Sequence, residues 1–265
     1  VNNDDFVNAR QMDRPFQPNR ADQKILQDIT HFRVFDISAD PFNSSRASYF
    51  HNAIGGYHAA KPGRIQDLYD FYISQNNMEI LNMLNAKYFI IPSEDGQPQA
   101  QQNPNAFGNA WFVKDIRWVK SANEEILSLS EVDLQNTAVI NSEFKDQVSQ
   151  DFNIEGNPEI TLESYQPNEL VYKTDASAQQ MVVFSEMYYQ PGWQAYIDGN
   201  KVDHVRANYV LRAMNIPAGE HRITFKFEPE VINLGSSISL ASSIILILII
   251  SGGVYLRFRN IDPTI

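Results

Sequence analysis

Hydrophobic positions in the first 156 residues switch between helical and strand spacing. Apolar residues at helical intervals predict helices that begin near Asp22, Ile65, Met78 and Glu124. Apolar, β-prone runs predict strands over residues 33–38, 87–93, 110–119 and 137–140. The polar stretch 97–109 predicts a loop between them. Because helices and strands alternate, we expect an α/β or α+β module over residues 1–156.

From residue 157 to residue 230 the pattern is that of short β-strands. Ile223, Phe225 and Phe227 alternate with polar residues, which predicts a strand with one buried face. Residues 181–184 are apolar without alternation, as in a central strand covered on both faces. Asp198-Gly199 is a type I′ hairpin signal. Together these features predict an all-β sandwich, jelly-roll-like, over residues 157–230.

A stretch of 23 residues without charge, Leu234–Leu256, predicts a transmembrane helix over residues 231–257. As a helix it would measure roughly 34 Å, enough for a hydrocarbon core of about 30 Å. Arg257 and Arg259 follow at once, so residues 258–265 are predicted to be cytoplasmic and residues 1–230 extracytoplasmic. The polar opening of the chain lacks a signal peptide, and we expect Val1 to be internal to a longer, multi-pass protein.

Charge and composition exclude several kinds of partner and of functional site. The net charge of −11 argues against nucleic acid as a partner. The absence of cysteine excludes disulfides, a thiolate nucleophile and a Cys-ligated zinc site. His51 and His58 lie seven residues apart with Gly55-Gly56 between them, which is a poor metal signal. We therefore expect no metal and no cofactor.

Five separated blocks carry a resemblance to a known family. They read SYFHNAIGGYHAAKPGRIQDLYDF (48–71), EILNMLNAKYFI (79–90), GNAWFV (108–113), FSEMYYQPGWQAYIDG (184–199) and ANYVLRAMNIPAGEH (207–221). In their order and spacing the chain resembles the C-terminal extracytoplasmic region and last helix of bacterial YfhO-family membrane proteins. The resemblance runs from about Arg33 to the apolar stretch.

This resemblance implies a multi-pass protein of the bacterial cytoplasmic membrane, similar to glycosyltransferases of the C superfold. Such enzymes take sugar from lipid-linked donors, and family members are associated with glycosylation of cell-surface polymers such as teichoic acid. Their catalytic acid is expected in the first outer loop, upstream of Val1. The resemblance therefore implies no catalytic residue in this chain, which we expect to be inactive alone.

The segment 49–64 is the densest in groups that bind sugars or phosphates. Aromatic rings stack on sugar faces, and cationic side chains bind phosphates. The candidates for contact with a glycan or lipid phosphate are Tyr49, His51, Tyr57, His58, Lys61 and Arg64. The alternative is a surface loop whose tyrosines pack on the core and whose two glycines make a turn.

A second candidate set follows the strand at 181–184. Glu186, Tyr188, Tyr189 and Trp193 would combine a carboxylate with an aromatic platform for sugar stacking. The alternative is that the rings fill the sandwich core.

Three functions stay open. The first is an accessory region that positions a glycan acceptor above a membrane-embedded sugar transferase. The second is a non-catalytic ectodomain of a membrane assembly that binds carbohydrate or a partner. The third is a structural ectodomain of an assembly or transport complex. The expected partners are the bilayer, the other helices of the same protein and, for the first function, polyprenyl-linked sugar and acceptor.

Overall fold

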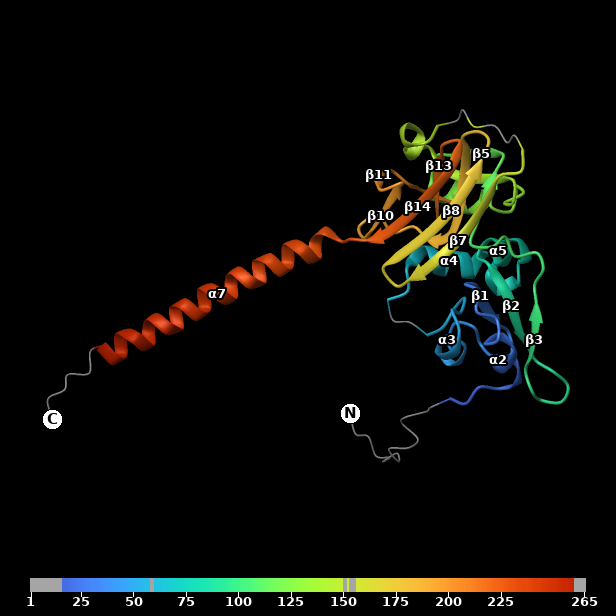
Figure 1. The fold of residues 1–265 in the computed structure, drawn as a ribbon. Coiled ribbons are helices and arrows are strands. Elements are labelled where there is room, and N and C mark those ends of the chain that lie inside the picture. Colours follow the sequence, from blue (N-terminus) through green and yellow to red (C-terminus); the bar gives the residue numbers. More distant parts are fainter. Residues whose placement is uncertain (1–15, 58–59, 150–151, 153–155, 260–265) are drawn as a thin grey trace.

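The computed structural model describes residues 16–57, 60–149, 152 and 156–259. In this part of the chain three β-sheets form a globular part, and one long helix, α7 (Glu230–Arg259), leads away from it (Figure 1). The predicted composition of a β-rich body followed by an apolar C-terminal helix is confirmed.

The smallest sheet has the order β1-β2-β3, with β1 (Arg33–Asp36) parallel to β2 (Ala86–Ile91) and β3 (Gln99–Gln102) antiparallel to it. Helix α2 (Arg20–Ile25) packs on one face through Ala21 and Ile25. The stretch 97–109 was predicted to be a loop, and this prediction was wrong, because β3 lies within it. Helix α2 begins at Arg20, two residues before the predicted start near Asp22, and Asn19 caps it.

Two larger sheets are built almost entirely from antiparallel pairs. The five-stranded sheet has the order β11 (Asn200–Val202), β10 (Trp193–Ile197), β14 (Gly219–Phe227), β8 (Glu169–Ala176) and β7 (Glu159–Gln166). The six-stranded sheet has the order β4 (Ala110–Val113), β9 (Gln180–Met187), β13 (Leu211–Ile216), β12 (Val205–Ala207), β6 (Thr137–Asn141) and β5 (Asp115–Val119). Only β5 and β6 pair in parallel among the neighbours described in these two sheets.

The two larger sheets pack face to face through a shared apolar core, as in a sandwich. Ile223 and Phe225 of β14 are fully buried there, which confirms their predicted inward orientation. Phe227 does not follow them: it is only partly buried and packs on the turn before β10. The predicted hairpin is confirmed, since Asp198 and Gly199 both have positive φ and join β10 to β11.

The other face of the six-stranded sheet is covered mainly by helices. The covering elements are α4 (Gly63–Phe71), η1 (Ile73–Gln75), α5 (Met78–Met83), α6 (Ala122–Ser128) and η2 (Ser142–Gln147). Strand β9 lies between β4 and β13 and is buried on both faces, as its lack of alternation predicted. Helix α3 (Arg46–Phe50) lies beside the small sheet.

Strands from both sides of residue 156 take part in the six-stranded sheet. β4, β5 and β6 precede that residue, whereas β9, β12 and β13 follow it. A separate N-terminal α/β module is therefore not confirmed, and the sandwich reaches back to Ala110. The division into folding domains at this point stays a prediction.

Helix α7 has the length and composition of a membrane span. It contains 30 residues, and its most apolar window has a mean hydropathy of 2.2 and is not buried against the globular part. A core helix of a globular protein would be mostly buried. Helix α7 is thus a candidate transmembrane helix.

Candidate functional site

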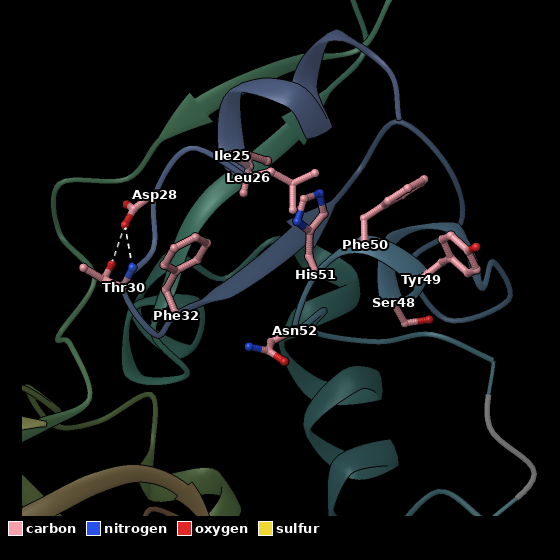
Figure 2. Close-up of a pocket in the computed structure, with 10 residues that line it drawn as sticks. All are labelled: Ile25, Leu26, Asp28, Thr30, Phe32, Ser48, Tyr49, Phe50, His51 and Asn52. Carbon is pink, nitrogen blue, oxygen red and sulfur yellow. Dashed lines mark hydrogen bonds between the residues drawn. The ribbon is translucent and has the colours of Figure 1, made fainter. Parts of the chain in front are cut away.

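A cleft of about 370 Å³ opens between α2, α3 and the loop that precedes β1 (Figure 2). Its lining combines apolar and aromatic side chains with polar ones: Ile25, Leu26, Asp28, Thr30, Phe32, Ser48, Tyr49, Phe50, His51 and Asn52. Tyr49 and His51 are predicted site residues. The cleft is thus the place where part of the 49–64 segment meets a concave surface.

The aromatic side of the cleft is made by α3. Tyr49 is 50% exposed, and its ring meets Phe50 edge to face at 4.9 Å and Phe16 at 5.5 Å between centroids. The guanidinium of Arg46 lies 5.3 Å from the centre of the Phe50 ring. These neighbours hold the Tyr49 ring while leaving half of the side chain open, as stacking on a flat ligand requires.

The opposite side of the cleft carries a fixed carboxylate. Asp28 accepts hydrogen bonds from the Thr30 amide at 3.0 Å and the Thr30 hydroxyl at 2.6 Å, and it pairs with Lys87 at 2.6 Å. Burial raises the pKa of Asp28, but the hydrogen bonds from Lys87 and Thr30 outweigh it and lower the pKa far below the usual range. Asp28 is therefore an ionised acceptor at the cleft.

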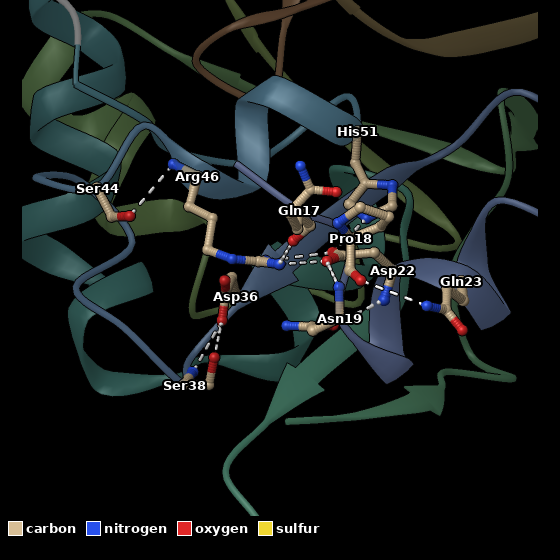
Figure 3. A network of polar contacts seen from close by, with 10 residues as sticks. All are labelled: Gln17, Pro18, Asn19, Asp22, Gln23, Asp36, Ser38, Ser44, Arg46 and His51. Atoms are coloured by element: carbon tan, nitrogen blue, oxygen red, sulfur yellow. Dashed lines mark hydrogen bonds and ion pairs between the residues drawn. The ribbon is translucent and has the colours of Figure 1, made fainter. Parts of the chain in front are cut away.

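The His51 side chain contacts a buried polar network that is centred on Asp22 (Figure 3). Asp22 accepts from the Asn19 amide at 2.7 Å and Asn19 accepts from the Asp22 amide at 3.0 Å, which is a capping box at the start of α2. Arg46 donates to both oxygens of the same carboxylate, and His51 Nε2 lies 3.0 Å from Oδ1. This network fixes His51 against α2.

The charge of Asp22 is maintained by its partners. Burial raises its pKa, but hydrogen bonds from Arg46, the Asn19 amide and His51 together lower it below the ordinary value. Asp22 has no exposed surface, so it positions His51 and does not itself contact a ligand.

The other residues of the first candidate set do not converge on this cleft. Tyr57 is 72% exposed and is not among the cleft residues, while His58 lies outside the described residues. Lys61 lies 4.2 Å above the Phe42 ring and donates to Gln66. Arg64 donates to Glu125 at 3.1 Å and to the Tyr209 carbonyl at 3.0 Å. Lys61 and Arg64 therefore do not line this cleft, and of the six candidates only Tyr49 and His51 do so among the described residues.

Lys61 instead lines a second, mostly apolar pocket of about 450 Å³ together with Gly55 and Gly56. Gly55 has φ +114°, and an added Cβ would lie 2.1 Å from the Pro41 carbonyl oxygen. The Gly-Gly pair is thus explained by a close turn of the backbone, which was the structural alternative.

Glu186 of the second candidate set is an internal ion-pair partner. It pairs with Arg33 at 3.3 Å and with His31 at 3.4 Å, and the His31 ring stacks on Tyr165 at 3.6 Å. Burial raises the pKa of Glu186, but the charge of Arg33 and the hydrogen bond of His31 lower it overall. Arg33 belongs to the small sheet and Glu186 to the six-stranded sheet, so this ion pair joins the two sheets and occupies the carboxylate that was expected to bind sugar.

The three rings of the second set pack against different neighbours, and none of them lies beside the Glu186 carboxylate as a common platform. Tyr188 lies edge to face with Phe144 and His204. Trp193 is covered by the guanidinium of Arg212 at 4.3 Å. Only Tyr189, at 54% exposure, keeps an open ring. The platform of carboxylate and adjacent rings expected from the sequence is not formed.

Asp22, Asp28 and Asn52 were missed by the sequence reasoning. The spacing Asn19-x-x-Asp22 is a capping-box signal that places Asp22 at the third helical position. Asp28-Ile29-Thr30 has the spacing of a side-chain turn. Neither pattern reveals which distant residues share the cleft. Among the described residues, no group of three His, Cys, Asp or Glu side chains could hold a metal ion.

The fold and the site define a class: a β-rich globular part joined to an apolar helix that is long enough to cross a membrane. Residues 119–239 match the model of the family described as "Bacterial membrane protein YfhO". The resemblance to this family of bacterial membrane proteins is therefore confirmed over residues 119–239. Searches of curated proteins and of solved structures found no match to the chain.

Proposed function

We propose that this chain is an extracytoplasmic accessory region of a multi-pass protein that transfers sugar from a lipid-linked donor to a cell-surface glycan or polymer. The chain holds the acceptor, while the reaction takes place elsewhere in the parent protein. The family match supports a membrane-associated role of the glycosyltransferase type. The observation that carries the acceptor-binding role is the cleft whose lining combines the half-exposed Tyr49 with the fixed carboxylate of Asp28.

Sugar recognition combines an apolar ring face with fixed hydrogen-bonding groups around its rim. Tyr49 supplies the half-exposed ring, and Asp28 supplies a carboxylate whose conformation is fixed by Thr30 and Lys87. The cleft volume of about 370 Å³ admits one or two sugar units. We assign the site binding and not chemistry, because the family resemblance implies that the catalytic acid lies outside this chain.

Replacing Tyr49 with Ala is expected to weaken glycan binding about tenfold, because the stacking face is lost. Isothermal titration calorimetry of the full chain with purified cell-wall glycans and teichoic acid measures this change. Tyr49→Trp should retain affinity. The matched control is Tyr57→Ala, which removes a more exposed tyrosine outside the cleft and should leave affinity unchanged. Equal effects of Tyr49→Ala and Tyr57→Ala would contradict the assignment of the cleft.

The same variants in the parent protein separate the two functions. If the region serves transfer, Tyr49→Ala should lower the amount of surface glycan at unchanged protein abundance. If binding is lost while surface glycan stays normal, the region is a non-catalytic carbohydrate-binding ectodomain.

The orientation of α7 gives a further test. Arg257 and Arg259 stand in its last turn, and cationic flanks remain in the cytoplasm. A reporter fused after Ile265 is therefore expected to be cytoplasmic, and residues 16–228 should be open to protease added from outside. Protection of the globular part together with an external reporter would reverse the compartment and remove the basis for the proposed function.

A further inference from the structure

Three aromatic side chains gather where the globular part meets α7. Tyr189 and Trp193 flank the turn between β9 and β10, and Phe227 ends β14. The Phe227 ring lies 6.5 Å from the Tyr189 ring, nearly parallel at 25°, and 5.4 Å from the Trp193 ring. We name Tyr189, Trp193 and Phe227 the aromatic collar.

The collar is fixed to the residues that lead into the apolar helix. The Glu228 amide donates to the Gly192 carbonyl at 2.7 Å, so the turn is bonded to the residue two positions before α7. A Cβ on Gly192 would lie 2.1 Å from the Phe227 ring, so the ring rests directly on the backbone of the turn. Only Pro229 then separates Glu228 from the helix. Figure 1 shows the ends of β10 and β14 beside the start of α7.

The position of the collar along the membrane normal follows from the helix geometry. The charge-free stretch begins at Leu234, four residues after the start of α7, which corresponds to about 6 Å. A bilayer has interfacial layers of about 5–8 Å on each side of its hydrocarbon core. The collar therefore falls in the interfacial layer when α7 spans the membrane. Tyr and Trp are enriched at this depth because their rings are apolar and their edges are polar.

Exposure and charge are consistent with this placement. Tyr189 is 54% exposed, and the exposed Val231 and Ile232 in the first turn of α7 extend the apolar surface toward the helix. Glu228 and Glu230 follow Phe227 in the chain, and the guanidinium that covers Trp193, that of Arg212, is buried, so it is not open to an anionic lipid. The attraction is therefore that of aromatic rings for the interface and not of opposite charges.

We propose that the aromatic collar rests in the lipid headgroup layer and holds the globular part at the bilayer surface. This inference assigns a lipid contact to the open ring of Tyr189. It does not depend on the proposed acceptor-binding role, nor on which side of the membrane the globular part lies.

The absence of cysteine makes a site-specific test direct. Gln190→Cys places a single thiol in the exposed collar turn and leaves all three rings in place, and Asn200→Cys places one at the start of β11, after the hairpin at the far end of β10. Each full-chain variant is labelled with a fluorophore and inserted into phosphatidylcholine nanodiscs that carry a nitroxide on the headgroup. The label at position 190 is expected to lose most of its fluorescence, and the label at position 200 to keep it. Equal quenching at the two positions would overturn the proposal.

A second set of variants tests whether the rings hold this position. In the Gln190→Cys background, Tyr189→Ser should reduce quenching by the headgroup nitroxide, whereas Tyr189→Trp should preserve it. Tyr57→Ser removes another exposed tyrosine and should change nothing. If quenching stays the same after Tyr189→Ser, α7 alone sets the position and the collar has no anchoring role. If quenching requires anionic lipid in the nanodisc, the contact is electrostatic and the proposal is wrong.

Discussion

Replacing Phe225 with Ala is expected to lower the free energy of unfolding by about 3–5 kcal/mol, the usual cost of removing a large ring from a packed core. Phe225 has no exposed surface and lies at the centre of the core between the two larger sheets. Its ring meets Phe184 at 4.9 Å and Tyr172 at 6.2 Å, both nearly perpendicular. Removing the ring would leave a cavity, and the surrounding side chains of the two packed sheets cannot move far enough to fill it.

Urea unfolding of the full chain in detergent, followed by near-ultraviolet circular dichroism, measures this loss. Phe71→Ala is the matched control, because Phe71 is about half exposed on α4 and its removal should cost less than about 1 kcal/mol. A cost below about 1 kcal/mol for Phe225→Ala would show that the ring is not part of the core and that the packing of β14 is misplaced.

The inward-facing residues of β14 could be predicted because successive side chains of a strand point to opposite faces, so a half-buried strand alternates apolar and polar residues. The same rule failed at residues 110–119, which were expected to form one strand. The chain breaks at Lys114, and the two halves, β4 and β5, become opposite edges of the six-stranded sheet. Both halves have buried positions, so periodicity alone does not reveal that they separate.

Strand β3 was missed for a different reason. Gln99–Gln102 are polar and mostly exposed, and the strand forms by antiparallel pairing with the apolar residues of β2. An edge strand of this kind has no hydrophobic pattern, because its backbone pairing and not its side chains determines it.

For the candidate site, the sequence predicted which residue types could bind a glycan but not which of them lie together. Aromatic and cationic side chains mark the 49–64 segment, and two of the six candidates chosen from it, Tyr49 and His51, line the cleft. Sequence spacing did not indicate that Arg64 would turn toward Glu125, a residue 61 positions away. It also did not indicate that Glu186 would be buried between Arg33 and His31. Such pairings depend on which distant elements pack together.

The second large effect is expected at Asp22, where Asp22→Asn should cost about 3 kcal/mol. Removing one partner of a buried ion pair typically costs about 3–5 kcal/mol, because the other charge is left unpaired. Arg46 keeps partial access to water, which places the expected loss at the lower end of that range. The carboxylate also caps α2 and orients His51, so the change should loosen the wall of the cleft.

The exposed ion pair of Arg117 and Glu131 supplies the control, at 3.9 Å and more than half exposed on both sides. Glu131→Gln should change stability by about 0.5 kcal/mol or less, because water screens the pair. Equal losses from Asp22→Asn and Glu131→Gln would contradict the importance of burial at Asp22.

The pH dependence identifies the carboxylate charge as the source of the stability. The folded-state pKa of Asp22 is lowered, so its contribution is fully present above the unfolded pKa of about 4 and is lost as the pH falls through the folded value. The stability difference between the unsubstituted chain and Asp22→Asn should therefore be largest at neutral pH and shrink below about pH 4. Urea unfolding across this range measures it. A difference that stays constant down to about pH 2 would assign the loss to altered packing around α2 instead of the ionised carboxylate.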